Sequence, residues 1–254
     1  MKISIIQTDI SWENKSLNFR KYEQVISKVA DTDIIILPEM FSTGFTDSTE
    51  SLAEPPHSET FDWMLHMADK NNSAICGSYI IKVKKKYFNR WVFVSPDGKS
   101  YHYDKRHLFR MNNVETGFTQ GNRRLVFKFR GFRICPNICY DLRFPVWSRN
   151  RNDYDLLINS ASWPHARRDV WITLLKARAI ENMVYVAGSN RIGTDGAGIK
   201  YSGDSMILSP KGEVLASAKD TESVITSDLS ITDLKSFRKK FPAHLDADTF
   251  IINK

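Results

Sequence analysis

Cys139 lies where a nucleophile could be presented to a substrate. It follows the apolar stretch 132–138 and precedes a polar turn that begins with Tyr140 and Asp141. A thiol between a strand and the following turn is held away from the sheet, as in the nucleophile elbow of hydrolases. Since a lone cysteine is more often a small buried hydrophobic residue, a catalytic role depends on neighbours that accept its proton and stabilise an oxyanion.

Glu39 and Lys105 are better candidates for these neighbours than any histidine. None of the six histidines lies in a recognisable cysteine-protease context, although His107 and His165 fall at predicted strand ends. Glu39 follows the apolar strand predicted for residues 34–37 after a single residue, Pro38, and the carboxyl ends of strands are where sites form in α/β folds. Lys105 also follows a predicted strand, where a surface salt bridge is the simpler explanation of an isolated lysine.

The composition indicates a globular protein of a reducing compartment. The chain has 254 residues, of which 42% are hydrophobic, and no apolar stretch approaches the roughly 20 residues that span a bilayer. The three cysteines have no framework spacing, which argues against a secreted disulfide scaffold. The N-terminus becomes polar too soon for a signal peptide. These features predict a cytoplasmic protein that does not bind membranes.

The net charge of +7 raises the possibility of nucleic-acid binding. Lys and Arg are scattered along the chain, and the densest run, 82–86, lies between two predicted strands, which is typical of a solvated hairpin turn. The sequence contains no zinc-finger spacing, no RRM-type aromatic motif and no basic helix. We therefore predict no nucleic-acid partner, and a modest positive field that could attract small anionic substrates.

Strand and helix patterns alternate along the whole chain without a linker, which predicts one domain over residues 1–254. Apolar residues at helical spacing predict helices over 14–30, 58–71 and 168–183, with Ser58 as the N-cap of the second. Strands are predicted over 2–8, 34–37, 74–83, 86–94, 125–129, 132–138, 155–160, 184–190, 204–208, 214–218 and 223–226, with a further strand that follows the turn at 96–99 and ends at Tyr103. So many strands with few helices favour two packed sheets with helices outside.

Three motifs, in this order and at these intervals, resemble the Glu-Lys-Cys triad of the nitrilase superfamily of carbon–nitrogen hydrolases. They are Leu-Pro-Glu at 37–39, Tyr-Asp-Lys-Arg-His-Leu-Phe at 103–109 and Cys-Tyr-Asp-Leu-Arg-Phe-Pro at 139–145. The resemblance continues through 159–164, 177–182, 185–191 and 203–205. It implies an α/β (α+β) fold, a four-layer αββα sandwich of two mixed sheets with helices outside, which commonly forms a homodimer through its helical face.

The finer pattern at 105–109, 139–149 and 189–193 is most similar to the bacterial ω-amidases. That resemblance implies hydrolysis of the terminal amide of α-keto acid monoamides, such as 2-oxoglutaramate and 2-oxosuccinamate, to the dicarboxylate and ammonia. It implies neither a metal nor another cofactor. Other activities of the superfamily stay open: N-carbamoyl amino acid amidohydrolase, aliphatic amidase and nitrilase. A non-catalytic interaction protein on the same fold is a further alternative.

The resemblance also implies roles for individual residues. Cys139 would be the nucleophile that forms a thioester acyl-enzyme, and Glu39 would accept the thiol proton. Lys105 would stabilise the oxyanion together with the backbone N–H of Tyr140. The family has a second glutamate between the lysine and the cysteine, and Glu115 is the only glutamate in that interval.

An α-keto acid carries a carboxylate, which a cation should bind. Arg143, Arg167 and Arg191 are the candidates, and the sequence does not choose among them. Trp163 and Phe41 could form walls of the pocket or belong to the core.

Two further expectations concern the surroundings of the thiol. Asp141 and Arg143 are predicted to pair and to hold the turn that follows Cys139. Cys76 and Cys135 are predicted to be core residues without a disulfide or a metal.

Overall fold

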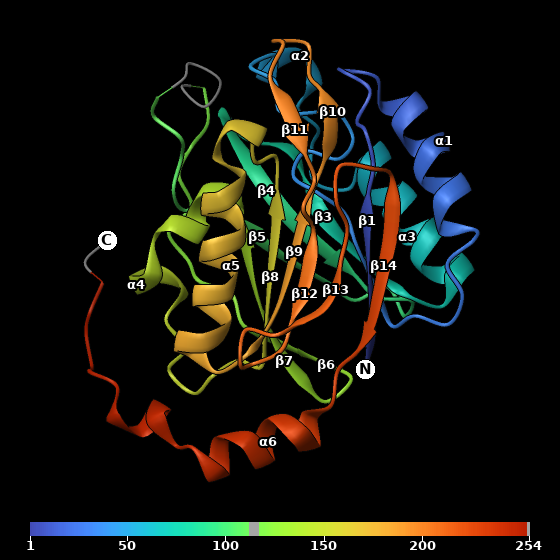
Figure 1. The fold of residues 1–254 in the computed structure, drawn as a ribbon. Helices are drawn as coiled ribbons and strands as arrows, with labels where there is room; N and C mark the ends of the chain where they lie inside the picture. The colour runs from blue at the N-terminus through green and yellow to red at the C-terminus, as the bar shows by residue number, and fades with distance from the viewer. Residues whose placement is uncertain (112–116, 253–254) are drawn as a thin grey trace.

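The computed structural model describes residues 1–111 and 117–252, and it contains two six-stranded mixed sheets packed face to face (Figure 1). The first sheet has the order β14-β1-β2-β3-β4-β5 and the second the order β13-β12-β9-β8-β7-β6. The strands of the first are β1 (Lys2–Gln7), β2 (Ile34–Ile36), β3 (Ala74–Val83), β4 (Lys86–Val94), β5 (Ser100–Asp104) and β14 (Ser223–Asp228). Those of the second are β6 (Phe127–Phe129), β7 (Phe132–Ile138), β8 (Leu156–Ala161), β9 (Tyr185–Asn190), β12 (Met206–Leu208) and β13 (Val214–Ser217).

Helices cover the outer faces of both sheets, so the predicted αββα sandwich is confirmed (Figure 1). Helices α1 (Lys15–Ile26) and α3 (Glu59–Asn71) pack on the first sheet, and α5 (Arg168–Asn182) packs on the second. The shorter helical elements are α2 (Thr49–Leu52), α4 (Pro145–Ser148) and α6 (Ile231–Lys240), with 3-10 turns η2 (Cys139–Arg143), η3 (His165–Arg167) and η4 (Ala243–Asp246). No helix within the described ranges is long and apolar enough to cross a membrane.

The layers follow from the alternation of side chains along strands whose two faces are both covered. In β2, Ile34 and Ile36 enter the core between the sheets, whereas Ile35 packs beneath the helices. In β3, Cys76 faces the inter-sheet core and Ile75 the helical layer. A strand that is apolar at every position is therefore the expected sequence for the centre of this sandwich.

Parallel pairing brings several strand ends to one edge of the sandwich. In the first sheet Ile36 of β2 lies opposite Cys76 of β3 in a parallel ladder. In the second, Ile138 of β7 lies opposite Ser160 of β8, and Ser160 lies opposite Ser189 of β9. The segments that leave the carboxyl ends of β2, β7 and β8 consequently meet, which is the arrangement that builds sites in sheets of this kind.

Some local predictions need correction. The second helix begins after Ser58, but the side chain that caps it is Glu54, whose carboxylate accepts bonds from the backbone N–H and the hydroxyl of Thr60 at 2.9 and 2.6 Å. The predicted hairpin turn at 82–86 is confirmed, with Lys84 in the left-handed region at φ +56°.

A small hairpin was not predicted from the sequence. It consists of β10 (Ile192–Thr194) and β11 (Lys200–Ser202), and it projects from the upper edge in Figure 1. The Asp-Gly pair at 195–196 is a strong hairpin signal. Asp195 accepts bonds from the backbone N–H groups of Ala197 and Ile199, at 3.0 and 2.9 Å, and so closes the turn.

Gly77 of β3 allows a close approach of the segment that follows β2. A Cβ at this position would lie 2.9 Å from Leu37 Cβ and 2.9 Å from Phe41 Cδ1. Because Leu37 Cβ is fixed to the backbone, the Gly77→Ala variant must displace the chain around it. We expect a loss of about 1–3 kcal/mol in the free energy of unfolding, as for other overpacked cores, measured by urea denaturation.

The matched control is Gly117→Ala. There an added Cβ meets only the side chain of Thr49, with its closest atom at 3.1 Å, and surface substitutions of this kind usually stay within about 0.5 kcal/mol. Equal midpoints for the two variants would contradict the packing argument at Gly77.

Candidate active site

Three segments bring Glu39, Lys105 and Cys139 together at the edge where the strand ends meet. Glu39 lies three residues beyond β2, Lys105 directly follows β5, and Cys139 begins η2 after β7. The Lys105 Nζ atom lies 2.9 Å from Glu39 Oε1, with the two side chains 1% and 0% exposed. Cys139 is 8% exposed. The predicted grouping of the three residues is therefore present in the structure.

The Glu39 carboxylate is held by three hydrogen-bond donors. Oε1 accepts from Lys105 Nζ at 2.9 Å and from Asn89 Nδ2 at 2.8 Å, and Oε2 accepts from the backbone N–H of Ser162 at 2.9 Å. Met40, at φ +47°, turns the chain after Glu39, and its N–H donates to Ser78 Oγ at 3.0 Å. The carboxylate is consequently fixed from both sheets.

Asn89 of β4 connects the glutamate and the lysine. Its side chain binds Glu39, and its backbone carbonyl accepts the N–H of Lys105 at 3.0 Å. The Lys105 Nζ also lies 5.4 Å from the centre of the Phe45 ring. Neither Asn89 nor Ser162 was predicted as a site residue, because their contacts with Glu39 join positions 50 and 123 residues apart.

Cys139 adopts the left-handed conformation, with φ +42°. This region is unfavourable for a residue with a side chain, and such strain is typical of functional turns. The same geometry is found in a nucleophile elbow, where a sharp turn exposes the nucleophile at the end of a strand. The Sγ atom lies 3.8 Å from the carbonyl oxygen of Ser162.

The surroundings of Cys139 favour the protonated form of its thiol. Burial raises the pKa of the thiol well above its usual range, and the charge of Glu39 together with a hydrogen bond to that carboxylate raises it further. Lys105 lowers the pKa but does not outweigh these effects. Glu39 is the carboxylate that contacts the thiol and acts on its pKa.

Asp141 holds the turn after Cys139, but not by pairing with Arg143 as predicted. Its buried carboxylate accepts bonds from the Tyr103 hydroxyl, from the backbone N–H and ring of His107, and from the N–H of Ile138. The Arg143 guanidinium instead lies 5.3 Å from the Trp163 ring centre. The partners of Asp141 thus come from β5, from the end of β7 and from residues 105–109, which we call the lysine loop.

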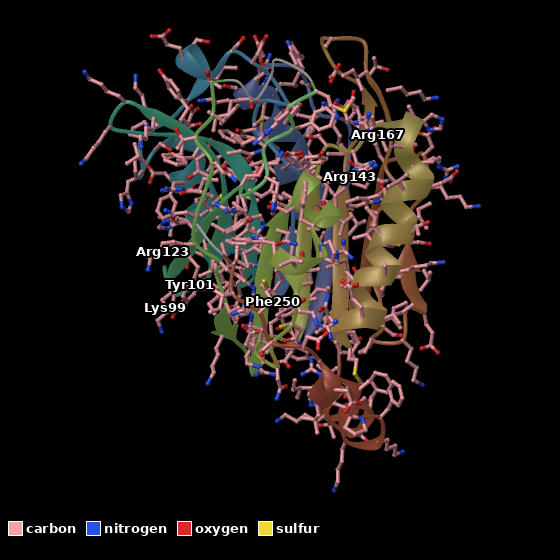
Figure 2. All side chains as sticks on the ribbon, turned by 90° about the vertical axis from the view of Figure 1, so that its left-hand side faces the viewer. Lys99, Tyr101, Arg123, Arg143, Arg167 and Phe250 are labelled. Atoms are coloured by element: carbon pink, nitrogen blue, oxygen red, sulfur yellow. The ribbon has the colours of Figure 1, made fainter. Side chains whose placement is uncertain are left out.

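A cavity of about 370 Å³ adjoins the thiol. Its walls are mainly aromatic and apolar, and they include two arginines. The lining residues are Phe45, Lys105, Phe109, Met111, Cys139, Tyr140, Arg143, Ser162, Trp163, Pro164, Ala166, Arg167, Ile199 and Tyr201. Figure 2 places Arg143 and Arg167 near each other by the upper end of α5.

The structure brings some of the predicted binding residues to this cavity and places others elsewhere. Arg143, Trp163 and Arg167 line it, as predicted. Phe41 does not, because the turn at Met40 directs its side chain into the helical layer, where it is fully buried. Glu115 lies outside the described residues.

Arg191 is also placed behind the cavity rather than in it. Its side chain is fully buried, and Nη2 donates to Asp9 Oδ1 at 2.8 Å and to the Ile10 carbonyl at 3.1 Å. The guanidinium lies 4.7 Å from the centre of the Tyr201 ring, which forms part of the cavity wall. Arg191 therefore supports the wall. Tyr201 and Ile199 were missed because the β10–β11 hairpin that carries them was missed.

No group of three or more His, Cys, Asp or Glu side chains within residues 1–111 and 117–252 is arranged to hold a metal ion. Cys76 and Cys135 are buried free thiols, as predicted for core residues.

Comparisons of sequence and of structure with known proteins agree on one family. The family model described as carbon–nitrogen hydrolase matches residues 2–239. The chain is 43% identical to omega-amidase YafV of Escherichia coli (strain K12), over 98% of each chain. It is 30% identical to a 2-oxoglutaramate amidase of Bacillus subtilis (strain 168), over 96% of each.

A solved structure extends the likeness to three dimensions. XC1258 from Xanthomonas campestris, described as a CN-hydrolase superfamily protein with an arsenic adduct in the active site, superposes with a TM-score of 0.97 at 38% identity. The match covers 100% of this chain and 99% of that one.

The opposing effects of Glu39 and Lys105 on the thiol can be separated by substitution. In Glu39→Gln the negative charge that raises the pKa of Cys139 is removed, while the Lys105 cation that lowers it remains. We expect the thiol pKa of this variant to fall below that of the wild type, measured from the ultraviolet absorbance of the thiolate as pH rises.

Adding Cys139→Ala to the wild type and to Glu39→Gln shows which part of the thiolate absorbance belongs to Cys139. Cys76 and Cys135 contribute little near neutral pH, because burial raises the pKa of both thiols, that of Cys135 to about 12. A thiol pKa that stays the same or rises in Glu39→Gln would show that the carboxylate is not what holds the proton on sulfur.

Proposed function

Because the chain belongs to the carbon–nitrogen hydrolase family and is an enzyme that hydrolyses carbon–nitrogen bonds, we propose that it acts on the terminal amide of α-keto acid monoamides such as 2-oxoglutaramate and 2-oxosuccinamate. One observation carries the proposal: a buried Glu39–Lys105 pair meets the Cys139 thiol at a cavity that also contains two arginines. The names of the omega-amidase and 2-oxoglutaramate amidase relatives support it.

In the first step the Cys139 sulfur attacks the carbon of the substrate amide. Glu39 takes the thiol proton as the C–S bond forms, so no free thiolate is needed in the resting enzyme. Charge develops on the amide oxygen, where the Lys105 ammonium and the backbone N–H of Tyr140 would stabilise it. The Tyr140 N–H lies in the first turn of η2, where backbone N–H groups lack partners within the helix.

The tetrahedral adduct then collapses. The C–N bond breaks, Glu39 returns its proton to the leaving nitrogen, and ammonia departs while the acyl group remains on Cys139 as a thioester. In the second half Glu39 removes a proton from water, which attacks the thioester carbon. The C–S bond breaks and the sulfur takes the proton back from Glu39, which releases the dicarboxylate and restores the resting enzyme.

The cavity suits an anionic amide with a short, flat chain. Phe109, Trp163 and Tyr201 offer aromatic walls to a planar α-keto acid. The Arg143 and Arg167 guanidiniums lie over the rings of Trp163 and Phe109, each 5.3 Å from the ring centre, which holds them at the cavity. A guanidinium in such a place can bind a carboxylate through two parallel hydrogen bonds. The homodimer and the cytoplasmic location remain predictions from the sequence.

Ammonia release from a panel of amides tests the proposed function. We expect turnover of 2-oxoglutaramate and 2-oxosuccinamate, and much slower turnover of glutamine, asparagine, N-carbamoyl amino acids, simple aliphatic amides and nitriles. Cys139→Ala should remove turnover while the urea midpoint stays near that of the wild type. The matched control is Cys135→Ala, which changes a thiol four residues away in the core and should remain active. Turnover of none of the keto-acid amides by the wild type would refute the substrate assignment.

Arg143→Met and Arg167→Met test the binding of the substrate carboxylate. Losing a hydrogen bond to a charged group costs about 1.5–3 kcal/mol, so we expect kcat/KM for the keto-acid amide to fall roughly 10- to 150-fold in the variant that removes the main contact. The same variant should treat butyramide, which has no carboxylate, much as the wild type does. Equal losses on both amides would indicate general damage to the cavity.

A further inference from the structure

We propose that His107 is a positioning residue that fixes the lysine loop to the cysteine turn, residues 139–144, through the Asp141 carboxylate. The two proposed oxyanion donors belong to separate segments: Lys105 follows β5 of one sheet, and Tyr140 follows β7 of the other. Their spacing must be accurate to about half an ångström for both to bind one oxygen. The proposal rests on the thiol chemistry described above and concerns what holds the two donors in register.

One buried carboxylate connects the two segments. Asp141 Oδ1 accepts from the backbone N–H of His107 at 2.9 Å and from its ring Nδ1 at 2.7 Å. Asp141 Oδ2 accepts from the N–H of Ile138 at 3.0 Å and from the Tyr103 hydroxyl at 2.7 Å. Because a carboxylate only accepts, Nδ1 carries the hydrogen. His107 is two residues from Lys105, and Asp141 adjoins Tyr140, so this contact sets the distance between the donors.

The His107 ring makes a second contact with the same turn. It stacks on Phe144 with ring centres 3.8 Å apart and planes 9° apart. Phe144 in turn meets the edge of Tyr140 at 5.1 Å, and Tyr140 meets Phe109 at 5.1 Å. The His107 ring therefore contacts the cysteine turn in two ways. It hydrogen-bonds to Asp141 and stacks on Phe144.

Two substitutions separate these interactions. His107→Phe keeps an aromatic ring to stack on Phe144 but has no donor for Asp141. His107→Asn places an amide N–H at the position of Nδ1 but loses the ring. If the hydrogen bond fixes the two oxyanion donors, His107→Phe should lower kcat by about 100-fold and change KM little, because a displacement of about 1 Å causes a loss of this size. His107→Asn should keep kcat within about tenfold of the wild type.

A matched control and a measurement without substrate complete the test. His102→Asn alters an exposed histidine of β5 and should leave kcat unchanged. Since Lys105 lowers the pKa of the Cys139 thiol, a lysine loop that moves away should leave this pKa higher in His107→Phe than in the wild type, and unchanged in His107→Asn. This titration applies whatever amide the enzyme uses, so a failed substrate assignment does not affect it.

Three results would overturn the proposal. One is a His107→Phe variant with wild-type kcat and wild-type thiol pKa. Another is a loss in His107→Asn as large as that in His107→Phe, or larger, because an intact donor to Asp141 would then not be enough to hold the two segments. The third is a rise in KM without a fall in kcat, which would place His107 in substrate binding. Urea midpoints of the variants show that the compared proteins are folded.

Discussion

The buried ion pair between Glu39 and Lys105 is the interaction on which the site depends. Removing two charges from water is costly, and one partner without the other would cost about 3–5 kcal/mol. The pair is tolerated because further donors complete it: the Asn89 amide and the Ser162 N–H both bind the Glu39 carboxylate. These donors come from β4 of one sheet and from the segment after β8 of the other, so the sandwich must close before the carboxylate is satisfied. The layered fold and the charge pair thus stabilise each other.

Burial and this pair together set the pKa of the Cys139 thiol. Burial raises the pKa most, and the charge of Glu39 raises it by more than the charge of Lys105 lowers it. The backbone at Cys139 is strained, at a cost on the order of 1–3 kcal/mol, and Asp141 maintains it by binding Ile138 on one side and His107 on the other. The strained turn and the ion pair together place the thiol beside the Glu39 carboxylate, as the proposed mechanism requires.

The strands could be predicted because their signals are local, and Glu39 and Cys139 each follow an apolar run that forms a buried strand. The grouping of these two residues with Lys105 came from the resemblance to the nitrilase superfamily. Contacts between distant segments could not be predicted, which is why Asn89 and Ser162 were missed. The sequence left open whether Phe41 forms a wall of the pocket or belongs to the core, and the left-handed turn at Met40 decides for the core.

The distribution of charge in the cavity also explains how an anionic amide would enter in the right orientation. A keto-acid amide could bind backwards, with its carboxylate on Lys105, if that lysine were the strongest cation present. Lys105 is paired with Glu39 at 2.9 Å, and the Glu39 charge repels a second carboxylate. Arg143 and Arg167 lie over aromatic rings, which leave the cationic charge in place. The carboxylate end of the proposed substrate would therefore be drawn to the arginines, which would leave the amide end facing Cys139.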